Sequence, residues 1–263
     1  MKEKISITLE KNLIKDLDKI IDNIFIKNRS HAIEFLVRKS LGEQKSAVLL
    51  LGGDVDLLRI ENEFRATMMI KGKPLIVHQV EKLKKEGFKS IYIVSRSELL
   101  NRIFEIIKNG EGYGVNVNYI EEVSAKGTMD SLRLLQGKIN STFLVIFGDL
   151  YFEKIRLQEL WESHIKHDYT STLILTTSPT PSQKGIVKLE GSKILDFTQK
   201  PKQTDVYIGF SSIFVSEPKL LDLEGQSLEL DVFPKLAREG YLGGHVSSEK
   251  EIHIHEKDDV KKV

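Results

Sequence analysis

From Lys45 to the end of the chain, continuously apolar runs alternate with segments of helical periodicity. The apolar runs are typical of strands that are buried on both faces, and the periodic segments are typical of helices that cover such strands. This alternation predicts an α/β fold with a Rossmann-like, mixed and mostly parallel sheet. Ligands of such sheets bind beyond the carboxyl ends of the strands, where the sequence places Gly52-Gly53 and Gly148-Asp149.

Composition excludes several classes of protein. The chain of 263 residues has no cysteine, which excludes disulfides, thiol catalysis and cysteine-ligated zinc. Because the formal net charge is only +1, any nucleic-acid surface must be a local patch. No apolar run approaches the length of a membrane span, so we expect a cytoplasmic protein without a membrane partner.

Residues 1–44 follow a different pattern. Lys4–Leu9 alternates polar and apolar residues, which predicts a strand, and two stretches of helical periodicity follow. Ser30 is a suitable N-cap for the second helix, and Gly42 is suited to end it. A strand and two helices of this size cannot bury a core alone, so we expect a homodimer or a higher even oligomer.

This pattern resembles the ribbon-helix-helix domains of the Arc, MetJ and CopG type. The resemblance implies that two paired strands enter the major groove of double-stranded DNA, while the start of the second helix holds a phosphate. The residues that it implies are Lys4, Ser6 and Thr8 toward the bases and Arg29, Ser30 and His31 toward the phosphates. The alternative that the residues leave open is a dimerisation segment that never contacts DNA.

Residues 45–263 resemble the sugar-phosphate nucleotidyltransferases, which join a nucleoside triphosphate to a sugar 1-phosphate and release pyrophosphate. The motifs that carry this resemblance, in family order, are "LLGG", "IKGKPLI", "AKGT", "VIFGDLYF", "FTQKP", "LELDVFPKLAREG" and "EIHIHEKDDVKKV". The resemblance implies that nucleotide is bound by Gly52, Gly53, Gly127 and Thr128, sugar phosphate by Lys200, and magnesium by Asp149. His253 occupies the position of the second metal-binding aspartate of the family.

The middle of the signature loop departs from the family pattern. Where the family has glycine, threonine and arginine, this chain has Val55, Asp56 and Leu57. Without glycine the backbone amides cannot wrap a triphosphate closely, and aspartates repel it. Arg65 stands where the family has a lysine, so Arg65 and Lys73 are the catalytic candidates if the protein is active. Since a histidine is a poor magnesium ligand, we expect weak magnesium dependence.

These departures favour a DNA-binding transcriptional regulator whose nucleotidyltransferase-like domain senses a nucleotide, a nucleotide sugar or a sugar phosphate. The predicted domains are residues 1–44 and residues 45–263. The alternative is an active sugar-1-phosphate nucleotidyltransferase with an accessory DNA-binding domain. A third interpretation is a structural assembly protein with neither activity. A turnover assay distinguishes the first two, because only the enzyme releases pyrophosphate.

Overall fold

The computed structural model describes residues 5–21, 26–40 and 45–263. Contacts divide the chain into two compact units, residues 1–43 with 165–167 and residues 44–164 with 168–263. Among the described residues, no helix combines the length and the apolar content that are needed to cross a bilayer.

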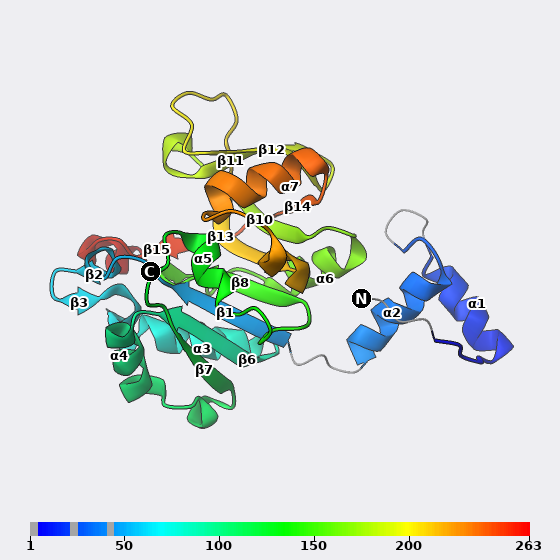
Figure 1. Ribbon diagram of the computed structural model, residues 1–263, viewed down its shortest axis with the longest axis horizontal. Coiled ribbons are helices and arrows are strands. Elements are labelled where there is room, and N and C mark those ends of the chain that lie inside the picture. Colours follow the sequence, from blue (N-terminus) through cyan, green and yellow to red (C-terminus); the bar gives the residue numbers. More distant parts are fainter. Residues whose placement is uncertain (1–4, 22–25, 41–44) are drawn as a thin grey trace. The chain divides into compact units, whose positions relative to one another are not determined.

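The first unit contains two helices, α1 (Lys11–Lys19) and α2 (Arg29–Ser40) (Figure 1). Leu17, Ile26 and Ala32 form its small buried cluster. Arg29 joins the two helices, because its guanidinium donates two hydrogen bonds of 2.8 and 2.9 Å to the carboxylate of Asp18. The predicted phosphate-binding charge is therefore engaged within the chain.

Two expectations for this unit are wrong. Residues 5–10 have no regular secondary structure, and Lys4 lies outside the described residues. An alternating pattern does not stabilise a strand by itself, because the backbone N–H and C=O groups need a second strand as hydrogen-bond partner. Ser30 does not cap α2 either, since the side chain of Asn28 accepts the backbone N–H of His31 at 2.9 Å.

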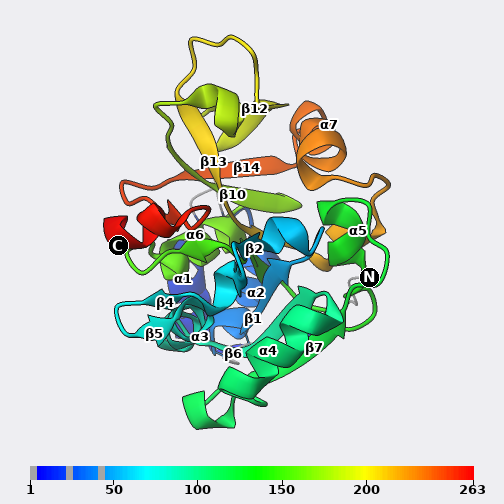
Figure 2. The ribbon, with the colours of Figure 1, turned by 90° about the vertical axis from the view of Figure 1, so that its left-hand side faces the viewer.

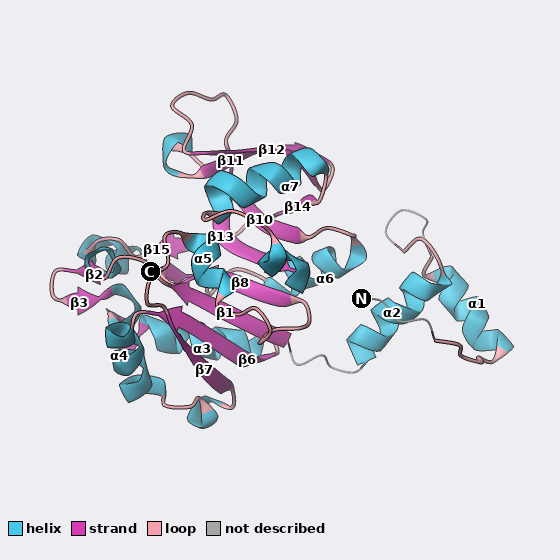
Figure 3. Ribbon diagram, in the orientation of Figure 1, coloured by secondary structure: helices cyan, strands magenta, loops and turns pink. Residues whose placement is uncertain are grey.

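The second unit is built on a nine-stranded sheet with helices packed against it (Figure 3). The strand order is β10-β14-β12-β11-β13-β8-β1-β6-β7. The strands are β1 (Lys45–Leu51), β6 (Phe88–Ser95), β7 (Asn116–Glu121), β8 (Phe143–Phe147), β10 (Ser171–Thr177), β11 (Gly185–Glu190), β12 (Lys193–Gln199), β13 (Ile208–Ser216) and β14 (Leu242–Val246).

The sheet is mixed, as the sequence predicts, but it is not mostly parallel. Strands β8, β1, β6 and β7 pair in parallel. Beyond them β13 runs antiparallel to β8 and β10, and β11 and β12 form an antiparallel hairpin. The reason is the length of the connections: a turn links β11 to β12, whereas parallel neighbours need a crossover helix.

Helices cover the parallel part of the sheet on both sides, and Figure 2 shows α3 and α5 on opposite sides of β1. Every residue of β1 after Lys45 is buried, which explains its continuously apolar sequence. The α-helices of this unit are α3 (Leu75–Lys85), α4 (Ser97–Ile107), α5 (Thr128–Arg133), α6 (Leu157–Lys166) and α7 (Phe233–Glu239). Short strands outside the main sheet are β2 (Arg59–Ile60), β3 (Glu63–Phe64), β4 (Met69–Ile70), β5 (Lys73–Pro74), β9 (Leu150–Tyr151) and β15 (Ile252–His253).

An aromatic cluster lies at the centre of the larger core. Phe214 of β13 is fully buried, and its ring lies 5.3 Å from that of Phe233 in α7 and 6.2 Å from that of Phe210. Edge-to-face contacts of this kind add to the hydrophobic stabilisation from burial. They join the antiparallel part of the sheet to α7.

We expect Phe214→Ala to lower the free energy of unfolding by about 3–5 kcal/mol, because it leaves a cavity in this cluster. The measurement is urea denaturation followed by circular dichroism. Phe104→Ala is the matched control, since Phe104 on α4 is 49% exposed. An equal loss of stability in both variants would contradict the assignment of Phe214 to the core.

Candidate functional site

The carboxyl ends of β1 and β8 meet at one edge of the sheet. Leu50 pairs with Phe147 in the parallel register, and the N–H of Gly148 donates to the carbonyl of Leu50 at 3.0 Å. The chain segments that leave the two strands, at Gly52 and at Asp149, therefore begin side by side. This is the edge at which the sequence predicts a ligand site.

Glu122 organises the glycines that follow β1. Its side chain is fully buried, one carboxylate oxygen accepts the N–H of Gly53 at 2.9 Å, and the other oxygen accepts the hydroxyl of Ser131. A Cβ on Gly52 would lie 2.0 Å from that second oxygen, so only glycine fits there. Gly53 has a φ of +116°, which also favours glycine. The two glycines are thus required by Glu122 and by the backbone turn.

The unusual part of the loop folds on itself. Asp56–Leu58 forms a single 3₁₀ turn, and the carboxylate of Asp54 accepts the N–H of Asp56 at 3.1 Å. Arg59 follows this turn, stacks on the ring of Phe64 with its guanidinium carbon 4.3 Å from the centroid, and forms an ion pair with Glu98. Arg59 is therefore held within the loop by its own neighbours.

The predicted nucleobase segment is held by the segment that precedes α7. A Cβ on Gly127 would lie 2.4 Å from the carbonyl oxygen of Gln226. The hydroxyl of Thr128 donates to Glu229 at 2.6 Å and accepts the N–H of Leu228 at 2.9 Å. Both residues at the start of α5 therefore fix the chain near Gln226, and the hydroxyl of Thr128 is already paired.

Asp149 is the predicted site residue around which other ionisable side chains gather. Its carboxylate lies 2.8 Å from Nε2 of His255 and 3.5 Å from Nη1 of Arg65. Burial raises the pKa of Asp149, but the hydrogen bond from His255 and the positive charges of His253, His255 and Arg65 outweigh it and leave that pKa below its usual value. Arg65 is thus the predicted cation that the fold brings to Asp149.

The strand β15 and the residues directly after it supply the two histidines, His253 from the strand and His255 from the bend that follows. Strand β15 pairs antiparallel with β9, so that His253 lies opposite Leu150, and the N–H of Ile254 donates to the carbonyl of Asp149 at 2.9 Å. Ile254 is fully buried, and alternate residues of an extended chain face opposite ways. His253 and His255 therefore share the face toward Asp149. The sequence analysis missed His255, although the His-x-His spacing in an extended segment is a signal for it.

Glu251 lies behind His253. Its side chain is almost fully buried, with a carboxylate oxygen 3.3 Å from Nε2 of His253 and 2.5 Å from Nζ of Lys184. Burial raises the pKa of Glu251, but the contacts with His253 and Lys184 outweigh it and lower that pKa. Neither Glu251 nor Lys184 carries a signal in the sequence, because nothing in their local pattern distinguishes them from surface charges.

Two lysines that the sequence also predicts as site residues make their contacts away from Asp149. Lys73 of β5 forms an ion pair of 2.8 Å with Glu81 of α3. Lys200 follows β12 with a φ of +47°, its side chain is exposed, and its N–H donates to the carbonyl of Lys184 at 2.9 Å. The contacts of Asp149 thus include Arg65 but neither of these lysines.

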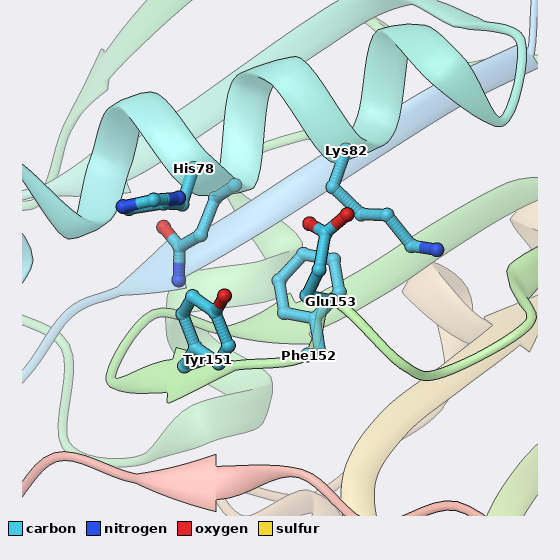
Figure 4. Close-up of a pocket in the computed structure, with 6 residues that line it drawn as sticks. His78, Lys82, Tyr151, Phe152 and Glu153 are labelled. Atoms are coloured by element: carbon cyan, nitrogen blue, oxygen red, sulfur yellow. The ribbon is translucent and has the colours of Figure 1, made fainter. Parts of the chain in front are cut away.

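The α3 helix holds the backbone around Asp149. The side-chain amide of Gln79, which is buried, donates to the carbonyls of Gly148 and Leu150 at 2.9 Å each. Beside it, a small recess is lined by α3, by β9 and by the two residues after β9, and the rings of His78 and Tyr151 meet edge to face there with centroids 5.4 Å apart (Figure 4). Sequence analysis missed Gln79 because it appears as one polar residue of a helix.

The donors around Asp149 do not fit magnesium. Magnesium prefers oxygen ligands in octahedral geometry, and the cluster supplies one carboxylate and two imidazoles. His253, which the sequence predicts at the position of the family's second aspartate, offers a nitrogen donor in this cluster. Magnesium is therefore poorly matched to this cluster.

The chain is an α/β protein with a charged site beyond the carboxyl ends of its parallel strands. The sequence model of the family described as Nucleotidyl transferase matches residues 47–241. The chain therefore belongs to the nucleotidyl transferase family.

Curated relatives are similar at moderate identity. A mannose-1-phosphate guanyltransferase of Yarrowia lipolytica is 32% identical over 176 residues, which cover 63% of this chain and 47% of that protein. A putative mannose-1-phosphate guanyltransferase of Sulfolobus acidocaldarius is 28% identical over 196 residues, which cover 73% of this chain and 54% of that protein. The chain spans about half the length of the curated relatives it matches.

Solved structures share the fold. A putative glucose-1-phosphate thymidylyltransferase of Bacillus anthracis superposes with a TM-score of 0.72 at 20% identity, covering 83% of this chain and 92% of that chain. HddC of Yersinia pseudotuberculosis gives 0.68 at 23% identity, covering 83% and 97%.

The comparisons contradict the interpretation of the chain as a DNA-binding transcriptional regulator. The curated relatives are named mannose-1-phosphate guanyltransferases, and nothing in the comparisons supports a ribbon-helix-helix domain or a DNA partner. The interpretation rested on the departures of the signature loop and on the N-terminal pattern, and a period of two over six residues is too short to define a strand without its partner.

We expect Gly52→Ala to lower the free energy of unfolding by about 1–3 kcal/mol, because the new Cβ displaces Glu122 and leaves the N–H of Gly53 without an acceptor. Urea denaturation measures the change. Gly112→Ala is the matched control, since a Cβ at Gly112 meets no atom within 4 Å. Equal midpoints for the two variants would show that Glu122 can move without cost.

Proposed function

We propose that the protein is an active sugar-1-phosphate nucleotidyltransferase. In this reaction a phosphate oxygen of the sugar 1-phosphate attacks the α-phosphorus of a nucleoside triphosphate. The bond between that phosphorus and the bridging oxygen breaks, and pyrophosphate leaves. Membership of the nucleotidyl transferase family supports the proposal. The observation that carries it is the pairing of Asp149 with Arg65, 3.5 Å apart, beyond the carboxyl end of β8.

The positively charged guanidinium of Arg65 is suited to bind the phosphate groups in this reaction. Its side chain is 22% exposed, and its Nε is buried without a hydrogen-bond partner among the described residues. Asp149 therefore holds one side of a guanidinium that keeps further donors for phosphate oxygens. Arginine presents these donors in a fixed fork that matches phosphate, and its charge offsets the charge that develops in the transition state.

The names of the relatives supply candidate substrate pairs that can be tested. The curated relatives are named mannose-1-phosphate guanyltransferases, so guanosine triphosphate with mannose 1-phosphate is the first pair to test. The similar structure from Bacillus anthracis is named a glucose-1-phosphate thymidylyltransferase, so thymidine triphosphate with glucose 1-phosphate is the second.

We expect pyrophosphate release with at least one combination of a nucleoside triphosphate and a hexose 1-phosphate, tested with magnesium, manganese and cobalt in turn. Asp149→Asn and Arg65→Ala should each lower kcat by roughly 10²–10³-fold, the usual cost of removing a group that stabilises developing charge. Asp196→Asn is the control, because Asp196 is an exposed residue of β12. The absence of turnover in every combination, with a folded chain, would contradict the proposal.

The two aspartates of the signature loop should weaken triphosphate binding. Asp54 and Asp56 are exposed close to Gly53, and each repulsion at an exposed site is worth about 0.2–1 kcal/mol. We expect Asp54→Asn with Asp56→Asn to lower the KM for the triphosphate several-fold at low salt while kcat stays unchanged. Asparagine keeps the oxygen that caps the turn, so the loop conformation is preserved.

The control for this pair is a titration with sodium chloride, because salt screens charges at exposed sites. The advantage of the double variant should shrink as the salt concentration rises. A KM that is unchanged at low salt would show that the aspartates point away from the bound triphosphate.

A further inference from the structure

Asp149, His253 and His255 form a cluster whose ligand atoms all lie within 4.8 Å of one another. The backbone of this cluster is fixed, because β9 pairs with β15 and the N–H of Ile254 donates to the carbonyl of Asp149 at 2.9 Å. The buried amide of Gln79 holds the carbonyls on either side of Asp149. The backbone at Asp149 and His253 is thus placed by paired strands, and His255 follows in the bend directly after β15.

We propose that Asp149, His253 and His255 bind a divalent transition-metal ion in preference to magnesium. Imidazole suits ions such as zinc, cobalt, nickel and iron, and two histidines with one carboxylate are a common ligand set for them. Magnesium and calcium prefer sets made of oxygen alone. The preference follows from the donor atoms of this chain, and it does not depend on the proposed turnover.

Glu251 adds the outer contact that metal-binding histidines usually have. A histidine ligand commonly donates its second ring N–H to a carboxylate, which fixes the ring and raises its basicity. Nε2 of His253 lies 3.3 Å from the buried carboxylate of Glu251, which leaves Nδ1 of His253 for an ion. The second oxygen of Glu251 is buried without a hydrogen-bond partner among the described residues.

The charged residues around the cluster disfavour magnesium, which binds mainly through electrostatic attraction. Arg65 lies 3.5 Å from the carboxylate of Asp149, and Lys184 lies 2.5 Å from that of Glu251. Each negative charge thus already has a positive neighbour, so magnesium gains little there. An ion that forms strong bonds to imidazole nitrogen gains those bonds in addition to the electrostatic attraction.

Ion binding needs at most a small rearrangement. Two ligands of one ion at ~2.1 Å cannot lie more than ~4.2 Å apart, and the ligand atoms of the cluster already lie within 4.8 Å of one another. His255 is the side chain that can move, because it is 54% exposed and is held by a hydrogen bond to Asp149. Two bonds to a shared ion would replace that hydrogen bond.

The test is a titration of the untagged full chain with cobalt(II), followed by its visible absorption and by calorimetry, with magnesium as the competitor. We expect saturable binding of one cobalt per chain that a large excess of magnesium does not displace. Glu251→Gln should weaken cobalt binding by about 10–100-fold, the usual effect of losing an outer carboxylate. His255→Ala and His253→Ala should weaken it further.

His245→Ala is the matched control, because His245 is a partly buried histidine of β14 outside the cluster. Its cobalt affinity should equal that of the unchanged protein. Circular dichroism establishes that each variant is folded, and the exposure of His255 makes His255→Ala the variant least disturbed by the change. Absence of saturable cobalt binding, displacement by equimolar magnesium, or an unchanged affinity in His255→Ala would each overturn the proposal.

The readout separates this inference from the proposed activity. A chain that binds cobalt but releases no pyrophosphate keeps the metal site and loses the proposed function. A chain that turns over with magnesium and does not bind cobalt keeps the function and loses the metal site.

Discussion

A single buried amide holds the candidate site together. Gln79 of α3 donates to the carbonyls of Gly148 and Leu150, and these residues flank Asp149. The N–H of Ile254 donates to the carbonyl of Asp149 itself. Buried backbone carbonyls need partners, and here a helix and the residue directly after β15 provide them. The backbone of Asp149 is consequently held in place. Arg65 and the two histidines are arranged around its carboxylate.

The site is organised as pairs of opposite charge. Asp149 contacts Arg65 and His255, while Glu251 contacts Lys184 and His253. A half-buried carboxylate without such partners would be destabilising. The same pairing has a chemical consequence, because neutralised carboxylates attract magnesium weakly. The chemistry of the cluster is therefore determined by its nitrogen donors and by the guanidinium of Arg65.

The loop after β1 contains a glycine pair whose structural role cannot be read from the sequence motif alone. Gly52 and Gly53 resemble a phosphate-binding pair, yet the structure uses both to accommodate the buried carboxylate of Glu122. The rest of the loop is stabilised by its own turn and by the contacts of Arg59 with Phe64 and Glu98. The departures from the family sequence thus coincide with a loop that is ordered by its own residues.

The sequence by itself determined the α/β class, the strand that leads to Asp149 and the family resemblance of residues 45–263, because the periodicity of apolar residues is a local property. It wrongly predicted a strand before α1 and a mostly parallel sheet, since strand pairing depends on partners that the local pattern does not specify. Only the tertiary structure decided that Glu122 holds Gly53, which is 69 residues away, and that His255 faces Asp149, which is 106 residues away. Contacts over such separations arise from the packing of the whole sheet, so no local pattern reveals which residue each of these side chains will meet.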